Sequence, residues 1–138
     1  TKKFCTTTDV MIGRYGPPIF QILRGIDGAY NVALMKAVPK KEITNDYLFY
    51  FLKNKKIQDY VIKKSIRAAG QSGVNKQALE PYKINLPPIK EQNNIVHNIK
   101  IIEEQTYKLK FLFKNKLEQI TKLKFSFLKN ILKEDKAA

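Results

Sequence analysis

The hydrophobic positions of the first 40 residues fall into short runs. These runs mix apolar and β-branched residues, and Gly and Pro bound them at residues 9–16, 17–25 and 28–39. Such a pattern is typical of short strands. The second run opens with two prolines, which are excluded from central positions of a hydrogen-bonded ladder. The pattern therefore predicts three strands, of which the second lies near an edge.

The spacing changes to a helical one over residues 44–66. Thr44 or Asn45 offers an N-cap, and apolar residues then recur three and four apart as far as Val61. This spacing predicts a helix pair, or one helix broken near Asn54. A Gly-containing loop with about one helical turn is expected over residues 68–81. Residues 82–87 alternate between apolar and polar like an edge strand.

The last third of the chain predicts one long helix that begins near Ile89 or Lys90, after Pro87 and Pro88. From Ile95 onward a heptad repeat can be laid down, with polar interruptions at Thr106, Lys116 and Asn130. At 1.5 Å per residue, 40 to 45 residues form a rod of roughly 60–70 Å. Such an apolar rod requires a second helix, from its own full-length chain or from a partner. The residues expected to pair are Ile95, Ile99, Ile102, Leu109, Phe113, Ile120, Leu123 and Phe127. The alternative is a helix that packs back on its own domain, at least in its first turns.

These elements predict an α+β fold with a small mixed or antiparallel sheet and packed helices. The expected division is a compact domain at residues 1–88, a long coiled-coil helix at 89–134 and a tail at 135–138. The chain opens in strand-like sequence without an initiator Met, so we expect a fragment that begins inside a domain.

The charge balance is strongly basic, with 26 Lys and Arg against 12 Asp and Glu and a formal net charge of +14. This balance favours an anionic partner, with nucleic acid first and an acidic membrane surface second. The alternative is that lysine merely keeps an apolar chain in solution. Neither a secretory signal nor an apolar run long enough to span a membrane is evident, so no membrane association is expected.

Few residues suited to catalysis or metal binding are present. The single Cys5 excludes an internal disulfide framework, and with a single His97 no metal cluster of the usual soft ligands can form. A lone cysteine fits a reducing, cytoplasmic location. No phosphate-binding loop and no methyltransferase or nuclease motif is recognisable. We therefore expect a non-catalytic protein without a metal or cofactor.

The segment "INLPPIKEQNNIVHNI" resembles the end of a target recognition domain in specificity subunits of type I restriction-modification systems. Lys90, Glu91, Gln92, Ile95 and Val96 match the hallmark of that family. The upstream segments "DVMIGRYGPPIFQI", "YNVALMKAVPKKEITNDYLFYFLKN" and "AAGQSGVNKQALEPYKINLP" resemble further parts of the domain in the right order. The family's domain has additional strands before Asp9, and a full subunit has two such domains and two long helices.

The resemblance implies that the globular part reads one half of a bipartite site in double-stranded DNA. It also implies that the long helix spaces two recognition domains and docks methyltransferase (M) subunits, which in turn bring restriction (R) subunits. The alternatives are a coiled-coil assembly protein without specific DNA binding and the C-terminal recognition domain of a fused restriction-methyltransferase enzyme.

Two segments, "GRYGPP" and "KKSIRAAGQSGVNKQ", carry side chains suited to DNA. Arg reads guanine and Asn or Gln reads adenine, whereas Lys and small polar groups hold the backbone. The candidates for DNA binding are Arg14, Tyr15, Lys63, Lys64, Arg67, Gln71, Ser72, Asn75 and Lys76. Lys40 and Lys41 are weaker candidates. For any one of these residues the alternative is an ordinary solvated surface charge.

Overall fold

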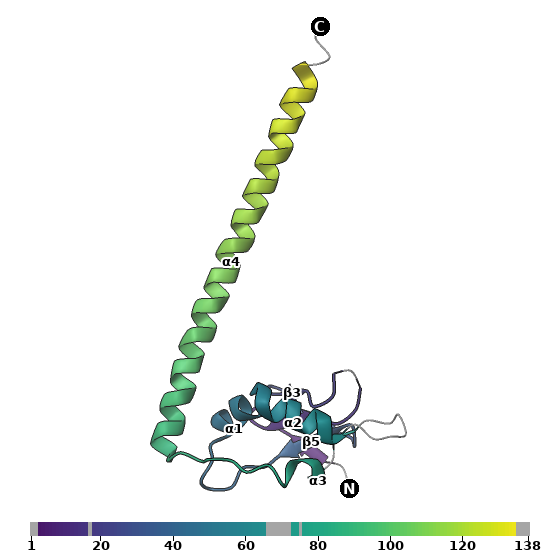
Figure 1. Cartoon of the computed structure of the whole chain (residues 1–138), viewed down its shortest axis with the longest axis vertical. Coiled ribbons are helices and arrows are strands. Elements are labelled where there is room, and N and C mark those ends of the chain that lie inside the picture. Colours follow the sequence, from purple (N-terminus) through teal and green to yellow (C-terminus); the bar gives the residue numbers. More distant parts are fainter. Residues whose placement is uncertain (1–2, 17, 66–72, 75, 135–138) are drawn as a thin grey trace. The chain divides into compact units, whose positions relative to one another are not determined.

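The computed structural model describes residues 3–16, 18–65, 73–74 and 76–134 (Figure 1). The chain divides into two compact units, Thr1–Val96 and His97–Ala138. The first unit contains all of the strands and three short helices, and the second consists of most of one long helix.

Within the described residues, five short strands form two antiparallel sheets, so the expected α+β fold is confirmed. The strands are β1 (Lys3–Cys5), β2 (Val10–Gly13), β3 (Ile22–Leu23), β4 (Gly28–Tyr30) and β5 (Leu34–Ala37). β1 pairs with β4, and the other sheet has the order β3-β2-β5. All four residues of the central strand β2 are buried. Its uninterrupted apolar sequence is thus explained by protein on both faces.

The run at residues 28–39 was expected to be one strand, and this expectation is wrong. A turn at Asn31 divides it into β4 and β5, which belong to different sheets. The Asn31 carbonyl accepts a hydrogen bond from the Leu34 N–H at 3.2 Å, and the Asn31 side chain accepts one from Ala33 N–H at 2.9 Å. Side-chain bonding of this kind favours a turn over a continued ladder.

The run at residues 17–25 also contributes less strand than expected, only the two residues of β3. Phe20, just before β3, has a left-handed backbone with φ of 63°. Its ring nevertheless belongs to the core and is 2% exposed. Apolar burial at Phe20 therefore offsets a conformation that L-residues rarely adopt, and it shortens the strand.

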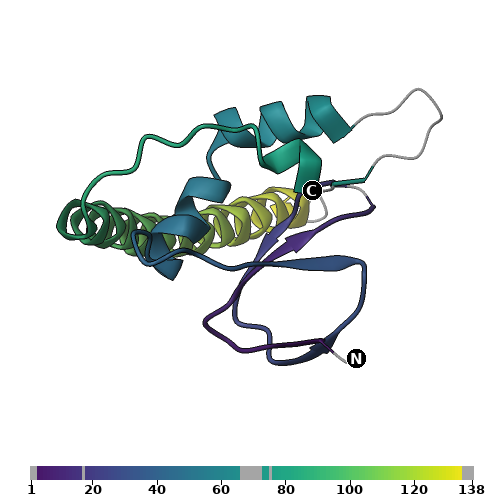
Figure 2. The same cartoon turned by 90° about the horizontal axis from the view of Figure 1, so that it is seen from below.

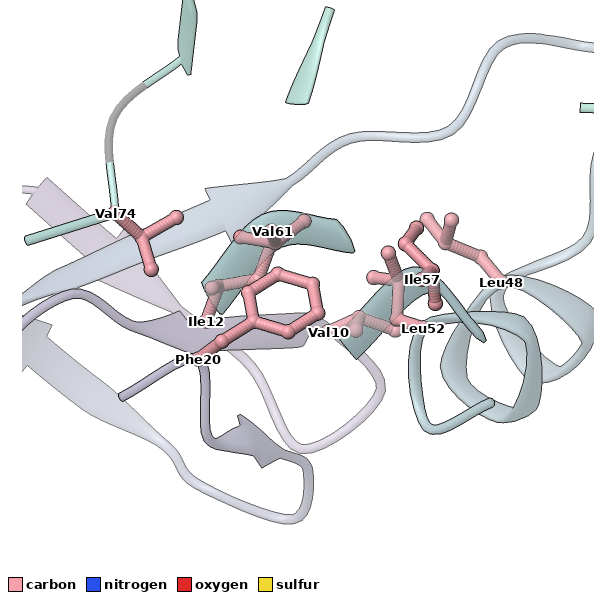
Figure 3. Packing of buried hydrophobic residues seen from close by; sticks show 8 residues of the cluster. All are labelled: Val10, Ile12, Phe20, Leu48, Leu52, Ile57, Val61 and Val74. Atoms are coloured by element: carbon pink, nitrogen blue, oxygen red, sulfur yellow. The ribbon is translucent and has the colours of Figure 1, made fainter. Parts of the chain in front are cut away.

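The expected helix pair is confirmed as α1 (Asn45–Leu52) and α2 (Lys55–Ser65). Thr44 caps α1, because its hydroxyl accepts a hydrogen bond from Tyr47 N–H at 3.2 Å. Asn54 separates the helices, and its side chain accepts a bond from Lys56 N–H at 2.9 Å. The two helices pack on β2 and with it form the main core. Figure 3 shows this core, which comprises Val10, Ile12, Phe20, Leu48, Leu52, Ile57, Val61 and Val74.

After the short helix α3 (Lys76–Leu79), the chain runs to α4 (Ile89–Glu134) through an extended segment (Figure 2). The expected edge strand at residues 82–87 is wrong, because this segment has no strand assignment. Its apolar residues Tyr82, Ile84 and Leu86 instead line an apolar hollow of about 380 Å³ beside Leu52 and Ile57. The alternation of apolar residues thus marks the side that faces protein, and it does not require a sheet.

Helix α4 begins at Ile89, as the sequence predicts. In its first two turns Gln92 and Val96 are buried within the first unit. For these two residues the alternative holds, in which the first turns of the helix pack on the compact domain. In the second unit nearly every described side chain of α4 is exposed. None of the helices in the described part of the chain has the length and apolarity needed to cross a membrane.

Candidate nucleic-acid interface

Arg14 joins three segments that are far apart in the sequence. Its backbone N–H donates to the Ala33 carbonyl, and its own carbonyl accepts from Val74 N–H, both at 2.9 Å. The guanidinium adds a bond from Nε to the Val74 carbonyl at 2.9 Å and one from Nη1 to the Val32 carbonyl at 3.1 Å. These hydrogen bonds join the turn after β2 to the turn before β5 and to the segment at Val74. We call this region, Arg14 with Val32, Ala33 and Val74, the Arg14 junction.

Tyr15 lies on the same junction. The Arg14 guanidinium carbon lies 5.1 Å from the centre of the Tyr15 ring. The ring also packs on Gly73 so closely that a Cβ at this glycine would lie 2.8 Å from Tyr15 Cε1. Tyr15 remains 53% exposed. The two segments that sequence analysis singled out for DNA binding thus meet, at Arg14 and Tyr15 on one side and at Gly73 and Val74 on the other.

The remaining candidate residues for DNA binding fall into two groups. Lys63 and Lys64 lie in the last turn of α2, where both are exposed. Lys76 begins α3, and its side chain is 81% exposed and 3.1 Å from the Glu80 carboxylate. Arg67, Gln71, Ser72 and Asn75 lie outside the described residues.

A basic hollow of about 350 Å³ lies next to the Arg14 junction. Both sheets contribute to it, together with the first residue of α3. Its lining residues are Lys3, Arg14, Tyr30, Val32, Leu34, Met35, Lys36 and Lys76. Four of these eight residues are cationic, and none is acidic. Arg14 and Lys76 were predicted from the sequence, whereas Lys3, Tyr30 and Lys36 were not.

Lys36 is held in the basic hollow by Asp9. Lys36 Nζ lies 2.6 Å from Asp9 Oδ2, which also accepts hydrogen bonds from Thr6 N–H at 2.8 Å and from the Thr6 hydroxyl at 3.1 Å. The bond from Lys36, followed by those from Thr6, lowers the pKa of Asp9 below its ordinary 3.8. The same bond raises the pKa of Lys36. Both groups are therefore charged at neutral pH.

Gln92 has a structural role that sequence analysis missed. The side chain is 0% exposed. Its Nε2 donates to the Glu42 carbonyl at 2.7 Å and to the Pro87 carbonyl at 2.8 Å. Its Oε1 accepts from Thr44 N–H at 3.0 Å. The amide thus joins the start of α4 to the N-cap of α1. A buried glutamine satisfied in this way is not distinguishable from a solvated one by sequence spacing.

No group of three or more His, Cys, Asp and Glu side chains in the described ranges is placed to hold a metal ion. The only histidine of the chain, His97, is exposed on α4. The polar groups that do come together are cations, a phenol and backbone amides. Such groups bind and orient an anionic ligand.

A basic surface of this kind favours nucleic acid as the ligand, and comparison with known families identifies the class. Residues 8–119 match the family described as Type I restriction modification DNA specificity domain. Because this match spans most of the 138 residues, the chain belongs to that family. The resemblance drawn from the sequence is confirmed. The domain is a non-catalytic recognition module for DNA sequence, and its context is a restriction-modification complex.

Proposed function

We propose that this domain reads one half of a bipartite site in double-stranded DNA as part of a type I specificity subunit. The observation that carries the proposal is the junction at Arg14 and Val74, with hydrogen bonds of 2.9 Å. It joins Arg14 and Tyr15 of one candidate segment to Gly73 and Val74 of the other, in a domain whose family recognises DNA sequence. Loops fixed on a rigid scaffold in this way are well suited to recognition.

The candidate residues would divide between base reading and backbone binding. Arg67, Gln71 and Asn75 have side chains suited to base edges, and they are proposed on the sequence alone. Lys63 and Lys64 are exposed at the end of α2 and suit phosphate contacts. Tyr15, which is 53% exposed, and Ser72, which is proposed on the sequence alone, are further candidates for polar contacts with DNA.

Helix α4 would be the spacer and the assembly surface. Ile95 and Ile99 are partly covered, whereas the apolar residues that follow in the repeat are 53% to 71% exposed. Those residues are Ile102, Leu109, Phe113, Ile120, Leu123 and Phe127. A stripe of this size requires burial against another helix. We propose a second long helix from the same full-length chain or from a mate, with M subunits docked on the pair and R subunits bound through them.

Methyl transfer, ATP hydrolysis and DNA cleavage are proposed to belong to those other subunits, and the complex is proposed to act in the cytoplasm. The chain would then need no cofactor of its own. A coiled-coil assembly protein without specific DNA binding is the competing function. The exposed stripe of α4 is compatible with it, but the family match and the joined loops are not explained by it.

A salt titration separates the two functions. The full subunit that contains this chain, assembled with M subunits, would be titrated with duplex DNA at several salt concentrations. A DNA-recognition module with several phosphate contacts predicts a steep linear fall of log affinity with log salt. If the chain is only an assembly protein, it should bind almost no DNA. Neutralising its basic residues should then leave the salt dependence of DNA binding by the assembled complex unchanged.

A further inference from the structure

We propose that the basic hollow binds one backbone phosphate of the duplex and thereby sets the position of the reading loops along the DNA. This inference rests on the proposed function and assigns a specific subsite within it. The described residues that line the hollow are Lys3, Arg14, Tyr30, Val32, Leu34, Met35, Lys36 and Lys76.

The hollow is built from fixed elements. Lys3 and Tyr30 are direct cross-strand neighbours in the sheet formed by β1 and β4. Lys36 belongs to β5, whose partner β2 is the buried central strand. Arg14 follows β2 directly, and Lys76 opens α3. Because Arg14 and Lys36 are held by hydrogen bonds to Val74, Val32 and Asp9, two of the four cations are positioned before a ligand arrives, which reduces the entropy lost on binding.

The charges of the hollow are incompletely balanced. Arg14 donates its two side-chain hydrogen bonds to neutral carbonyls, so its positive charge is oriented without being neutralised. The charge of Lys36 is balanced by the carboxylate of Asp9, which also accepts a hydrogen bond from Thr6 N–H. Lys76 has only an exposed pair with Glu80 within one helix, and such pairs are weak and easily exchanged. An incoming anion therefore meets a positive site.

The lining chemistry favours phosphate over a base edge. Reading a base requires a defined pattern of donors and acceptors, commonly from Asn, Gln or Arg. Lysines act instead as point charges suited to phosphate oxygens. Val32, Leu34 and Met35 supply the apolar part of the lining and lower the local dielectric, which strengthens attraction between the lysines and an anion. A phosphate bound here would fix register without carrying sequence information.

The test uses Lys3→Gln and Lys76→Gln in the full subunit assembled with M subunits. Lys55→Gln is the matched control, because Lys55 and Lys76 are both 81% exposed and both pair with an acid four residues on. Lys55 does not line the hollow. Each hollow variant is expected to reduce the salt slope by about one, so the affinity ratio between 50 and 200 mM salt shrinks about 3.5-fold. Lys55→Gln should leave the slope unchanged.

Neutral methylphosphonate links placed one at a time along the cognate duplex locate the contact. Among the positions that weaken binding of the wild-type complex, one is expected to have no further effect on the Lys76→Gln complex. The proposal is overturned if the Lys3→Gln and Lys76→Gln complexes show the same salt slope as the wild type or the Lys55→Gln complex. Altered sequence preference in these variants would overturn it as well, since the hollow would then read bases. A wild-type complex that binds no DNA would contradict the proposed function itself.

Discussion

The Oε1 atom of Gln92 accepts a hydrogen bond from the backbone N–H of Thr44 at 3.0 Å. Thr44 is also the N-cap of α1, where its hydroxyl accepts from Tyr47 N–H. The Gln92 amide donates to two further carbonyls, those of Glu42 and Pro87. One buried side chain therefore satisfies backbone groups at the start of both α1 and α4.

Replacing Gln92 with Leu is expected to destabilise the first unit by about 2–4 kcal/mol. The substitution leaves one buried N–H and two carbonyls without their partner, and each such group costs about 1–3 kcal/mol before local relaxation. Urea unfolding monitored by circular dichroism measures the loss. Asn93→Leu is the control, because Asn93 is the next residue of the same helix and is exposed. Equal stability of the two variants would refute the structural role of Gln92.

Replacing Gly73 with Ala is expected to weaken DNA binding more than it lowers stability. The new Cβ would lie 2.8 Å from Tyr15 Cε1, so the half-exposed ring must move. We expect an unfolding free energy lower by less than about 1 kcal/mol and a measurable loss of affinity for duplex DNA. The double variant Gly73→Ala, Tyr15→Ala is the control. The effects of the two substitutions on affinity should not add, because Tyr15→Ala removes the ring that Gly73→Ala displaces.

The pair formed by Asp9 and Lys36 predicts a stability loss in acid. Because the folded pKa of Asp9 is lowered below 3.8, the unfolded chain takes up a proton first as the pH falls. The contribution of Asp9 is thus fully present well above pH 3.8 and is lost as the pH falls through its folded pKa. Thermal unfolding of the wild type and Asp9→Asn between pH 7 and pH 3 measures this. The stability difference should shrink toward low pH, and a constant difference would contradict it.

Helix α4 predicts an assembly that depends on its apolar stripe. Leu109→Asp together with Phe113→Asp should split the assembly, because both side chains are more than half exposed in the isolated helix. Lys122→Asp is the control, since at 3.6 residues per turn it lies half a turn around the helix from Phe113. Light scattering with and without M subunits measures the mass. An unchanged mass for the double variant would show that the stripe is not the pairing surface.

Local periodicity was enough to predict the helices. Spacing, capping residues and prolines predict a cap at Thr44 or Asn45, a helix pair or a break near Asn54, and a long helix that starts near Ile89 or Lys90. The structure has the cap at Thr44, two helices separated at Asn54 and the start of α4 at Ile89. The order of the segments resembling the known family was likewise sufficient to identify the family. These features depend on residues close together in the chain, which a single sequence records directly.

The strands were harder to predict, because their limits depend on tertiary contacts. The Asn31 turn sends β4 and β5 to different sheets, although the run at residues 28–39 reads as one strand. Residues 82–87 alternate because one side faces an apolar hollow. The basic hollow was missed for the same reason, since Lys3 and Lys36 are 33 positions apart and lie in different sheets, so only the tertiary fold brings them to one hollow.

Sequence-specific reading of a half-site is tested most directly by selection from a library of randomised duplexes. The methyltransferase complex carrying this chain would be compared with the same complex carrying Arg67→Ala. The account predicts enrichment of a bipartite sequence by the wild type. It also predicts that the variant relaxes one position of a single half, with a loss of about 1–3 kcal/mol for the original site. Two results would contradict sequence-specific reading by this domain. In the first, the wild type enriches no sequence. In the second, the enriched sequence stays the same when this domain is replaced by that of another family member.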